Sequence, residues 1–197
     1  IEEANSPYYV TTLENIRPLL KARNEFSHKG TYGHALLIAG SIGMAGASVL
    51  AARACLRSGV GLLTVHVPEA NRPIIQAAVP EAMAHIDENE HCFALPVDTE
   101  RFTAVAIGPG LGQSEETARA LHLQLSSAQE PLILDADALN ILAEHPDWLP
   151  LVPPHSILTP HPGEMDRLTG HTTNSFERLQ RARSMATRMK VNIILKG

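Results

Sequence analysis

From Gly33 onward the chain alternates short apolar runs with longer segments of helical periodicity, and no other feature restricts its fold as strongly. The apolar runs are nearly continuous rather than interrupted by polar residues, as expected for strands that are covered on both faces. They occupy residues 34–39, 62–67, 103–107, 132–134, 156–158 and 191–196. This pattern predicts an α/β fold of βα units around a parallel-rich sheet.

Four segments between and after these runs predict the helices that cover the sheet. Residues 45–58 are good helix formers, and Ser114 is a typical cap for a helix whose first turn is acidic. We expect Asp137 to cap a short helix that runs to His145, where a proline follows. Residues 175–190 carry apolar side chains at helical spacing.

Size and composition exclude several classes of protein. A compact chain of 197 residues buries about 70% of its unfolded surface, so it needs no disulfides. Cys55 and Cys92 form no Cys-x-x-Cys pair, which favours a reducing compartment over a disulfide or structural zinc framework. A net charge of −5 with 4% aromatic residues is a poor footprint for nucleic acid. We expect a cytoplasmic protein that binds neither nucleic acid nor membrane, because it has neither a spanning run nor a signal peptide.

The first 28 residues differ in character from the rest of the chain. They begin with the acidic residues 1–5 and contain a candidate helix at residues 12–21, with Pro7 before it and Pro18 near its end. We expect residues 1–28 to be a lead-in segment that packs peripherally, and residues 29–197 to be the folded domain.

Two glycine-rich turns follow predicted strands, at residues 40–47 and 108–114. In an open α/β sheet the ligand lies beyond the carboxyl ends of the strands, where such turns deliver the chain into a helix N-terminus. Neither turn has the Gly-x-Gly-x-x-Gly spacing or a following Gly-Lys-Ser/Thr. A single turn of this kind can be purely structural, but two on one sheet edge can hold two portions of an extended anionic ligand.

Charged and polar side chains follow the later strands. Asp135 and Asp137 come directly after residues 132–134; Asp137 has an ordinary role as a helix cap, whereas Asp135 at the strand tip suits a sugar hydroxyl, an amide or a magnesium-bound water. His161 lies between two prolines that hold it in a rigid extended loop. Glu164 either joins His161 in a site or begins the next helix.

Lys196 ends the last predicted strand and either neutralises a phosphate or is simply solvated. Taken together, the residues at the strand ends predict a phosphate-rich ligand, a nucleotide, without fixing a reaction.

In these same segments the sequence resembles the ADP/ATP-dependent NAD(P)H-hydrate dehydratases of the ribokinase-like superfamily. The resemblance extends from about residue 29 to the end of the chain, and it is carried by residues 29–33, 40–47, 56–62, 108–112, 134–140 and 159–164. It implies a ribokinase-like three-layer α/β/α fold with a mostly parallel central sheet, the C-terminal part of the fold being missing.

The resemblance also implies a reaction. Enzymes of this family restore NADH or NADPH that has added water across a ring double bond, using ADP or ATP with Mg²⁺. The ring hydroxyl is phosphorylated, and elimination of phosphate then regenerates the ring and leaves AMP or ADP. Such a phosphoryl transfer needs positioning and charge neutralisation, which fits two glycine-rich helix starts, a carboxylate and a lysine.

Carried over position by position, the resemblance assigns roles to nine residues. Those expected to bind or shape the pocket of the hydrated dinucleotide are Ala47, Gly110, Gly112, Asp135, Asn140 and His161. Two residues are expected to begin the phosphate strip, the segment that binds the phosphates of the nucleotide: Lys196 and Gly197. One residue is expected to act on the hydration shell of Mg²⁺: Glu164.

The chain departs from the family pattern in one respect. The family places its general-base aspartate in a later Asn-x-Gly … Gly-Ser-Gly-Asp segment, and no such run occurs here. We therefore assign no catalytic residue and expect a domain truncated at its C-terminus. The lead-in resembles the segment that connects an epimerase domain to this domain in many relatives. Oligomers are common in the superfamily, so the resemblance also implies a homo-oligomer.

Two other functions stay open. A kinase of the same superfamily, acting on a small alcohol such as a vitamin precursor or sugar, would share the sheet and the nucleotide strip. A non-catalytic nucleotide-binding module would explain the missing aspartate.

Overall fold

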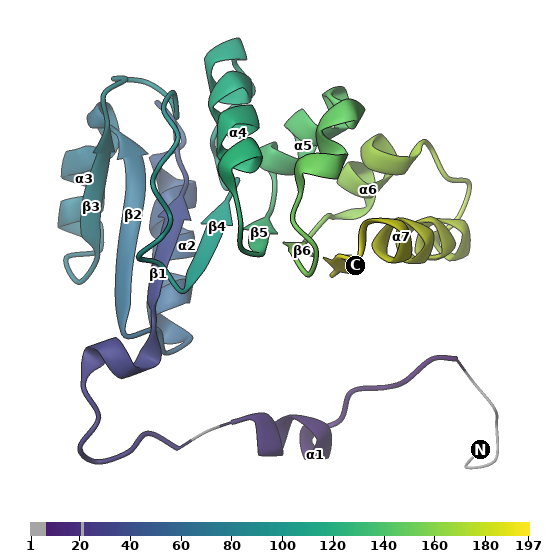
Figure 1. Cartoon of the computed structure of the whole chain (residues 1–197), viewed down its shortest axis with the longest axis horizontal. Helices are drawn as coiled ribbons and strands as arrows, with labels where there is room; N and C mark the ends of the chain where they lie inside the picture. The colour runs from purple at the N-terminus through teal and green to yellow at the C-terminus, as the bar shows by residue number, and fades with distance from the viewer. Residues whose placement is uncertain (1–6, 21) are drawn as a thin grey trace.

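A computed structural model describes residues 7–20 and 22–197 of the chain. Within these residues seven strands form one sheet, in the order β3-β2-β1-β4-β5-β6-β7, and every neighbouring pair is parallel (Figure 1). The strands are β1 (His34–Ile38), β2 (Leu62–Pro68), β3 (Met83–Asp87), β4 (Ala104–Ile107), β5 (Leu132–Leu134), β6 (Ile157–Leu158) and β7 (Asn192–Ile193).

The α-helices of the described residues mostly follow the strands as crossover connections. They are α1 (Leu13–Ile16), α2 (Ala45–Arg57), α3 (Arg72–Ala78), α4 (Glu115–Ser127), α5 (Asp137–Glu144), α6 (Pro162–Thr169) and α7 (Ser175–Met189). Short 3₁₀ turns are η1 (Arg17–Leu19), η2 (Lys29–Tyr32), η3 (Glu69–Asn71) and η4 (Pro146–Leu151). In the part of the chain that the structure describes, no helix has the length and apolar character needed to cross a membrane.

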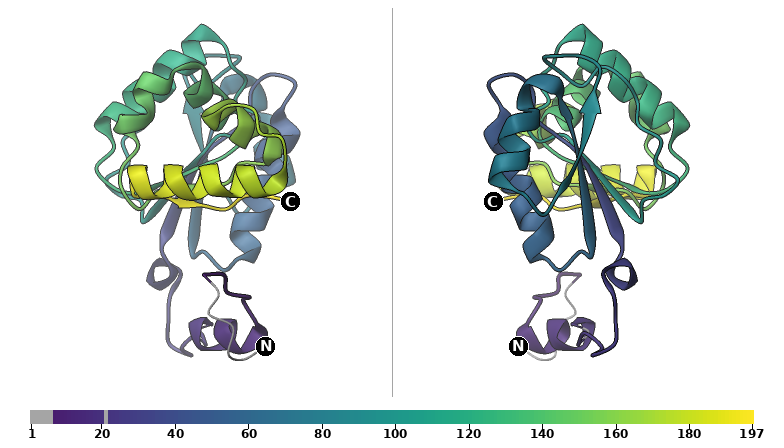
Figure 2. Two further views of the ribbon diagram at one scale, coloured as in Figure 1. Left: turned by 90° about the vertical axis from the view of Figure 1, so that its right-hand side faces the viewer. Right: turned by 90° about the vertical axis from the view of Figure 1, so that its left-hand side faces the viewer.

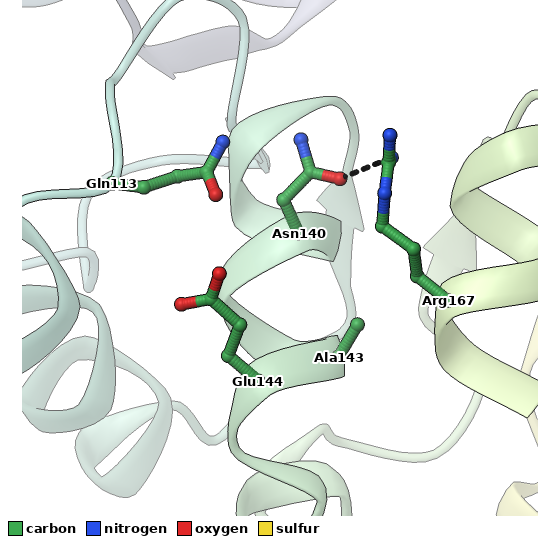
Figure 3. A pocket seen from close by; sticks show the side chains of 5 residues that line it. All are labelled: Gln113, Asn140, Ala143, Glu144 and Arg167. Atoms are coloured by element: carbon green, nitrogen blue, oxygen red, sulfur yellow. Dashed lines mark hydrogen bonds between the residues drawn. The ribbon is translucent and has the colours of Figure 1, made fainter.

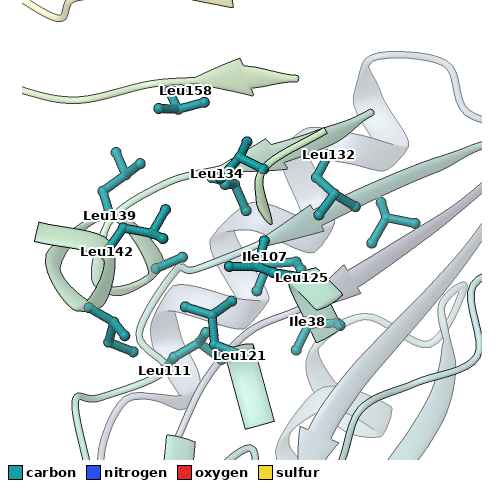
Figure 4. Packing of buried hydrophobic residues seen from close by; sticks show 14 of the residues in the cluster. Ile38, Ile107, Leu111, Leu121, Leu125, Leu132, Leu134, Leu139, Leu142 and Leu158 are labelled. Atoms are coloured by element: carbon teal, nitrogen blue, oxygen red, sulfur yellow. The ribbon is translucent and has the colours of Figure 1, made fainter. Parts of the chain in front are cut away.

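The sheet separates two hydrophobic cores. In β1 the side chains of Leu36 and Ile38 enter one core, whereas those of Ala35 and Leu37 enter the other, as the two-residue period of a strand requires. The larger core receives side chains from α4, α5, α6 and α7, and the smaller one from α2 and α3. Figure 4 shows leucines of α4 and α5 packed against the strands in the larger core. Figure 2 shows α2 and α3 on one side of the sheet and α4 and α5 on the other.

The predicted parallel sheet is confirmed, but one βα unit was missed. The chain forms α3 and β3 between residues 72 and 87, where no element was predicted. Strand β3 is at the edge of the sheet, and only Asp87 of its five residues is buried. An edge strand of this mixed composition has no continuous apolar run to reveal it.

Three boundaries were also wrong. Strand β7 covers only two residues of the predicted 191–196. The cap of α5 is Ala136, with a φ of 47°, rather than Asp137. The candidate helix at residues 12–21 is split into α1 and η1, and Pro18 is the second residue of η1. Lys21 and residues 1–6, which include the acidic start, lie outside the described part of the chain.

The described residues of the lead-in, 7–20 and 22–28, lie below the sheet in Figure 1, at the amino-terminal ends of the strands and therefore opposite the glycine-rich turns. Arg23 donates a hydrogen bond of 2.7 Å to the carbonyl of Gly59 and stacks over the ring of Tyr32. The division of the chain at residue 28 stays a prediction.

A buried carboxylate fixes the loop that follows β3. Asp87 is 2% exposed, and its Oδ2 accepts a hydrogen bond from Nε2 of His66 at 3.0 Å. Burial alone would raise the pKa of Asp87, but hydrogen bonds from His66 and from the amides of Ala94, Asn89 and Leu95 lower it to about 2. The same loop reaches the first glycine-rich turn, where the carbonyl of His91 accepts from the amide of Ile42 at 2.8 Å.

The lowered pKa of Asp87 predicts acid sensitivity. The charge of Asp87 stabilises the fold fully above its ordinary pKa of 3.8, and this contribution is lost as the pH falls toward about 2. We expect Asp87→Asn to lower the free energy of unfolding at pH 7 by about 2 kcal/mol and to flatten its decline below pH ~4. Urea unfolding at a series of pH values, with the exposed Asp98→Asn as control, measures both effects. Parallel pH curves for wild type and Asp87→Asn would contradict this role.

Candidate functional site

The strand order reverses between β1 and β4, since the chain builds outward from β1 in one direction and then from β4 in the other. Beyond the carboxyl ends of two such strands the following loops part to opposite faces, and ligands of open α/β sheets bind there. The two glycine-rich turns follow β1 and β4, so both lie at this switch point.

Direct hydrogen bonds join the two turns. The amide of Gly40 donates to the carbonyl of Pro109 at 2.8 Å, and the buried hydroxyl of Ser41 donates to the carbonyl of Gly110 at 2.9 Å. A Cβ at Gly110 would lie 2.8 Å from the Cβ of Ala47. The structure thus brings Ala47 and Gly110, two of the predicted substrate-binding residues, into contact.

The third glycine of the second turn is held by a neighbouring carboxylate. Oδ2 of Asp137 accepts from the amide of Gly112 at 2.9 Å, while its Oδ1 accepts from the side-chain amides of Gln113 and Asn140 at 3.1 and 3.3 Å. Asp137 therefore connects α5 to the glycine-rich turn instead of capping α5. Asn140, another predicted substrate-binding residue, is placed by this network.

Arg167 extends the network to α6. Its Nη1 donates to Oδ1 of Asn140 at 2.8 Å, and the side chains of Gln113, Asn140 and Arg167 follow one another across α5 in Figure 3. With Ala143 and Glu144 they line a pocket of about 370 Å³. Sequence reasoning missed Gln113 and Arg167, because neither lies directly after a strand.

Asp135 forms an ion pair with Lys196. The ammonium of Lys196 lies 2.7 Å from Oδ1 of Asp135, and 4.0 Å from Oε2 of Glu164. Burial works to raise the pKa of Asp135, but Lys196, the Thr159 hydroxyl and a backbone amide together hold it below its ordinary value. The structure thus joins a residue predicted for the substrate pocket to one predicted for the phosphate strip. Gly197, next in the chain, is exposed.

His161 caps α6. Its Nδ1 accepts hydrogen bonds from the amides of Gly163 and Glu164 at 3.0 and 3.3 Å, and Oε2 of Glu164 in return accepts a hydrogen bond from the amide of His161 at 2.8 Å. This reciprocal arrangement is a capping box, so Glu164 begins a helix, as one of its two predicted roles required. With Nδ1 accepting, the proton of a neutral imidazole is on Nε2. The imidazole is half exposed at this sheet edge.

The described residues contain no group of three His, Cys, Asp or Glu side chains that could hold a metal ion. Glu164 offers one carboxylate, 5% exposed at its side chain, whose oxygens are engaged by His161 and approached by Lys196. A directly coordinated cation therefore does not fit this residue set, although one carboxylate and the phosphates of a bound nucleotide can share a Mg²⁺ through water.

A family model described as NAD(P)H-hydrate dehydratase matches residues 35–197 of the chain. The chain belongs to this family. It is 40% identical over 195 residues to the ADP-dependent (S)-NAD(P)H-hydrate dehydratase of Bacillus subtilis, covering 98% of this chain and 67% of that protein. It is 39% identical to a bifunctional NAD(P)H-hydrate repair enzyme of Coxiella burnetii, covering 93% of this chain and 37% of that protein.

Solved structures agree with this membership. The B. subtilis ADP/ATP-dependent NAD(P)H-hydrate dehydratase, co-crystallised with ATP/Mg²⁺, matches with a TM-score of 0.78 and 38% identity, over 94% of this chain and 65% of that one. A ribokinase-like superfamily protein of Enterococcus faecalis matches with a TM-score of 0.74 and 27% identity, over 89% of this chain and 61% of that one. The predicted ribokinase-like fold is confirmed. The chain thus spans about two thirds, or less, of the length of these family members.

Gly108 provides a test of the site's architecture. Its φ is 141°, and a Cβ there would lie 1.7 Å from the carbonyl oxygen of Asp135. We expect Gly108→Ala to destabilise the fold by more than about 3 kcal/mol or to prevent folding, because backbone must move to admit a methyl group. Gly46→Ala is the control: nothing lies within 4 Å of its Cβ position in α2, and we expect a gain of about 0.5–1 kcal/mol. Thermal unfolding of both variants measures these changes in stability. If Gly108→Ala is as stable as Gly46→Ala, the close approach of Gly108 to the carbonyl of Asp135 is contradicted.

Proposed function

We propose that this chain takes part in the nucleotide-dependent dehydration of hydrated NADH or NADPH. The observation that carries the proposal is the joined pair of glycine-rich turns at the switch point, where Ala47 and Gly110 touch and Ser41 bridges the turns. A turn without bulky side chains lets a flat ring approach the backbone closely. The family membership and the activity for which the B. subtilis relative is named support the same proposal.

In this proposal the carboxyl-end edge of the sheet binds the two substrates at different places. The hydrated ring lies against Ala47 and Gly110. The half-exposed imidazole of His161 has its Nε2 3.3 Å from Oε1 of Glu164, and a polar group of the substrate would replace Glu164 as the acceptor of the Nε2 proton. Lys196 lies beside Asp135 and Glu164 and offers its ammonium to a phosphate of ADP or ATP. Phosphoryl transfer to the ring hydroxyl releases its proton; loss of phosphate and of a ring proton then restores the double bond.

The co-substrate and partners follow from the same relatives. We propose ADP or ATP as the phosphate donor, arriving with Mg²⁺, because the B. subtilis structure was co-crystallised with ATP/Mg²⁺. Glu164 would then act on the magnesium shell through water. Because two relatives are bifunctional repair enzymes, we propose that a second repair activity, an epimerase, works with this domain. We further propose a homo-oligomer.

The direct test is the recovery of nicotinamide absorbance when the chain is mixed with hydrated NADH, Mg²⁺ and either ADP or ATP. We expect recovery that depends on the nucleotide and that identifies the donor. Omitting the nucleotide is the control. Binding of NADPH without recovery would favour a non-catalytic module, and consumption of a small alcohol with release of ADP would favour the kinase alternative.

His161 has two roles in this proposal, and two variants separate them. His161→Asn keeps a side-chain oxygen that can cap α6 but removes the imidazole, whereas His161→Ala removes both. We expect both variants to lower kcat/KM by at least about tenfold, since each loses the Nε2 donor. Only His161→Ala should also lose about 1 kcal/mol of stability. Activity that survives in His161→Asn would restrict His161 to the capping of α6.

A further inference from the structure

The pocket between α5 and α6 contains a cation without an acidic partner. Within the described residues Arg167 has no carboxylate oxygen within 4 Å of its guanidinium, and its hydrogen bond is to the neutral amide of Asn140. Neighbouring arginines differ in this respect. Arg178 is paired with Asp166 at 2.8 Å, and Arg181 with Glu177 at 2.6 Å. Asp166 precedes Arg167 in the chain but is engaged by Arg178, so the charge of Arg167 is left for an incoming anion.

A continuous set of hydrogen bonds connects the guanidinium of the exposed Arg167 to the glycine-rich turn. The amide of Gly112 is bound by Asp137, Asp137 accepts from Asn140, and Asn140 accepts from Arg167. A guanidinium held in one orientation loses less side-chain entropy when it binds a phosphate than a freely rotating one. Arg167 is therefore better prepared for an anion than an ordinary exposed arginine.

The pocket has room for part of a ligand and a definite polarity. Its volume is about 370 Å³, and Figure 3 shows Gln113 and Arg167 on opposite sides with Asn140 between them. Glu144, also on the lining, carries a negative charge that repels an anion. A phosphate group in this pocket is thus directed to the Arg167 side.

We propose that this pocket binds the phosphate-bearing, unreactive part of the dinucleotide and that Arg167 contacts its phosphate oxygens. The inference rests on the proposed function, since it needs the ring to lie at the Ala47–Gly110 contact. Asn140 and Gly112, both in the set of residues predicted for the substrate, connect that contact to the pocket. Two sources of phosphate fit: the pyrophosphate common to both dinucleotides, and the 2′-phosphate of NADPH alone. Arg167 can make the paired hydrogen bonds that either phosphate accepts.

The test is fluorescence titration of the chain with NADPH and, separately, with NADH, for wild type, Arg167→Gln, Arg167→Lys and the matched control Arg188→Gln on α7. We expect Arg167→Gln to weaken NADPH binding by about tenfold or more and Arg167→Lys by less, since lysine keeps the charge but not the planar fork. Arg188→Gln should stay within about twofold, as an exposed charge far from the ligand does. Increasing salt should weaken binding to wild type more than to Arg167→Gln.

The outcomes separate the proposals. An equal loss for NADH and NADPH assigns Arg167 to the pyrophosphate, and a loss confined to NADPH assigns it to the 2′-phosphate. If Arg167→Gln binds NADPH with the same affinity and the same salt dependence as wild type, the inference is overturned and the proposed function stays intact. Failure of wild type to bind either dinucleotide would contradict both. If Arg167→Gln instead weakens ADP and spares NADPH, the pocket serves the other substrate and the inference is wrong.

Discussion

The close approach of backbone to backbone at the carboxyl ends of β1, β4 and β5 is the constraint on which the rest of the site depends. The carbonyl of Asp135 occupies the position that a Cβ of Gly108 would take, and the Cβ of Ala47 lies close to the position that a Cβ of Gly110 would take. These contacts leave no room for a Cβ, so the backbones come close enough to form hydrogen bonds. The hydroxyl of Ser41 donates to the carbonyl of Gly110 between the first two strand ends, and the amide of Asp135 donates to the carbonyl of Ile107 between the second and the third. A ligand that reaches this edge meets amides and small residues in a fixed arrangement.

The sequence predicts the strands that carry a continuous apolar run, including the edge strand β7, and it misses β3, which has no such run. Strands β1 and β4 are central and largely apolar, and their predicted positions agree with the structure to within a residue. Strand β3 is an edge strand, and its buried residue is an aspartate whose burial depends on His66 and on backbone amides. Hydrogen bonds between side chains far apart in sequence have no local pattern, so this unit was missed.

The same distinction applies to the site. The glycine-rich turns were predicted because positive φ angles and close contacts demand glycine at particular positions, and this demand is visible in the sequence. The role of Asp137 was not, because a helix cap and a tertiary acceptor for Gly112 require the same residue type. Likewise His161 and Glu164 have the spacing of a capping box and of a site, and in the structure they form the box while the imidazole stays half exposed.

The two cations of this edge differ in their partners, and this difference determines how each can meet an anion. Lys196 is already neutralised by Asp135 at 2.7 Å, so a phosphate that binds Lys196 must compete with that carboxylate or share the ammonium with it. Loss of this contact removes an interaction that keeps the pKa of Asp135 below its ordinary value. Phosphate binding at Lys196 is thereby coupled to the proton affinity of Asp135, whereas Arg167, bonded to an amide, accepts an anion without displacing a charge.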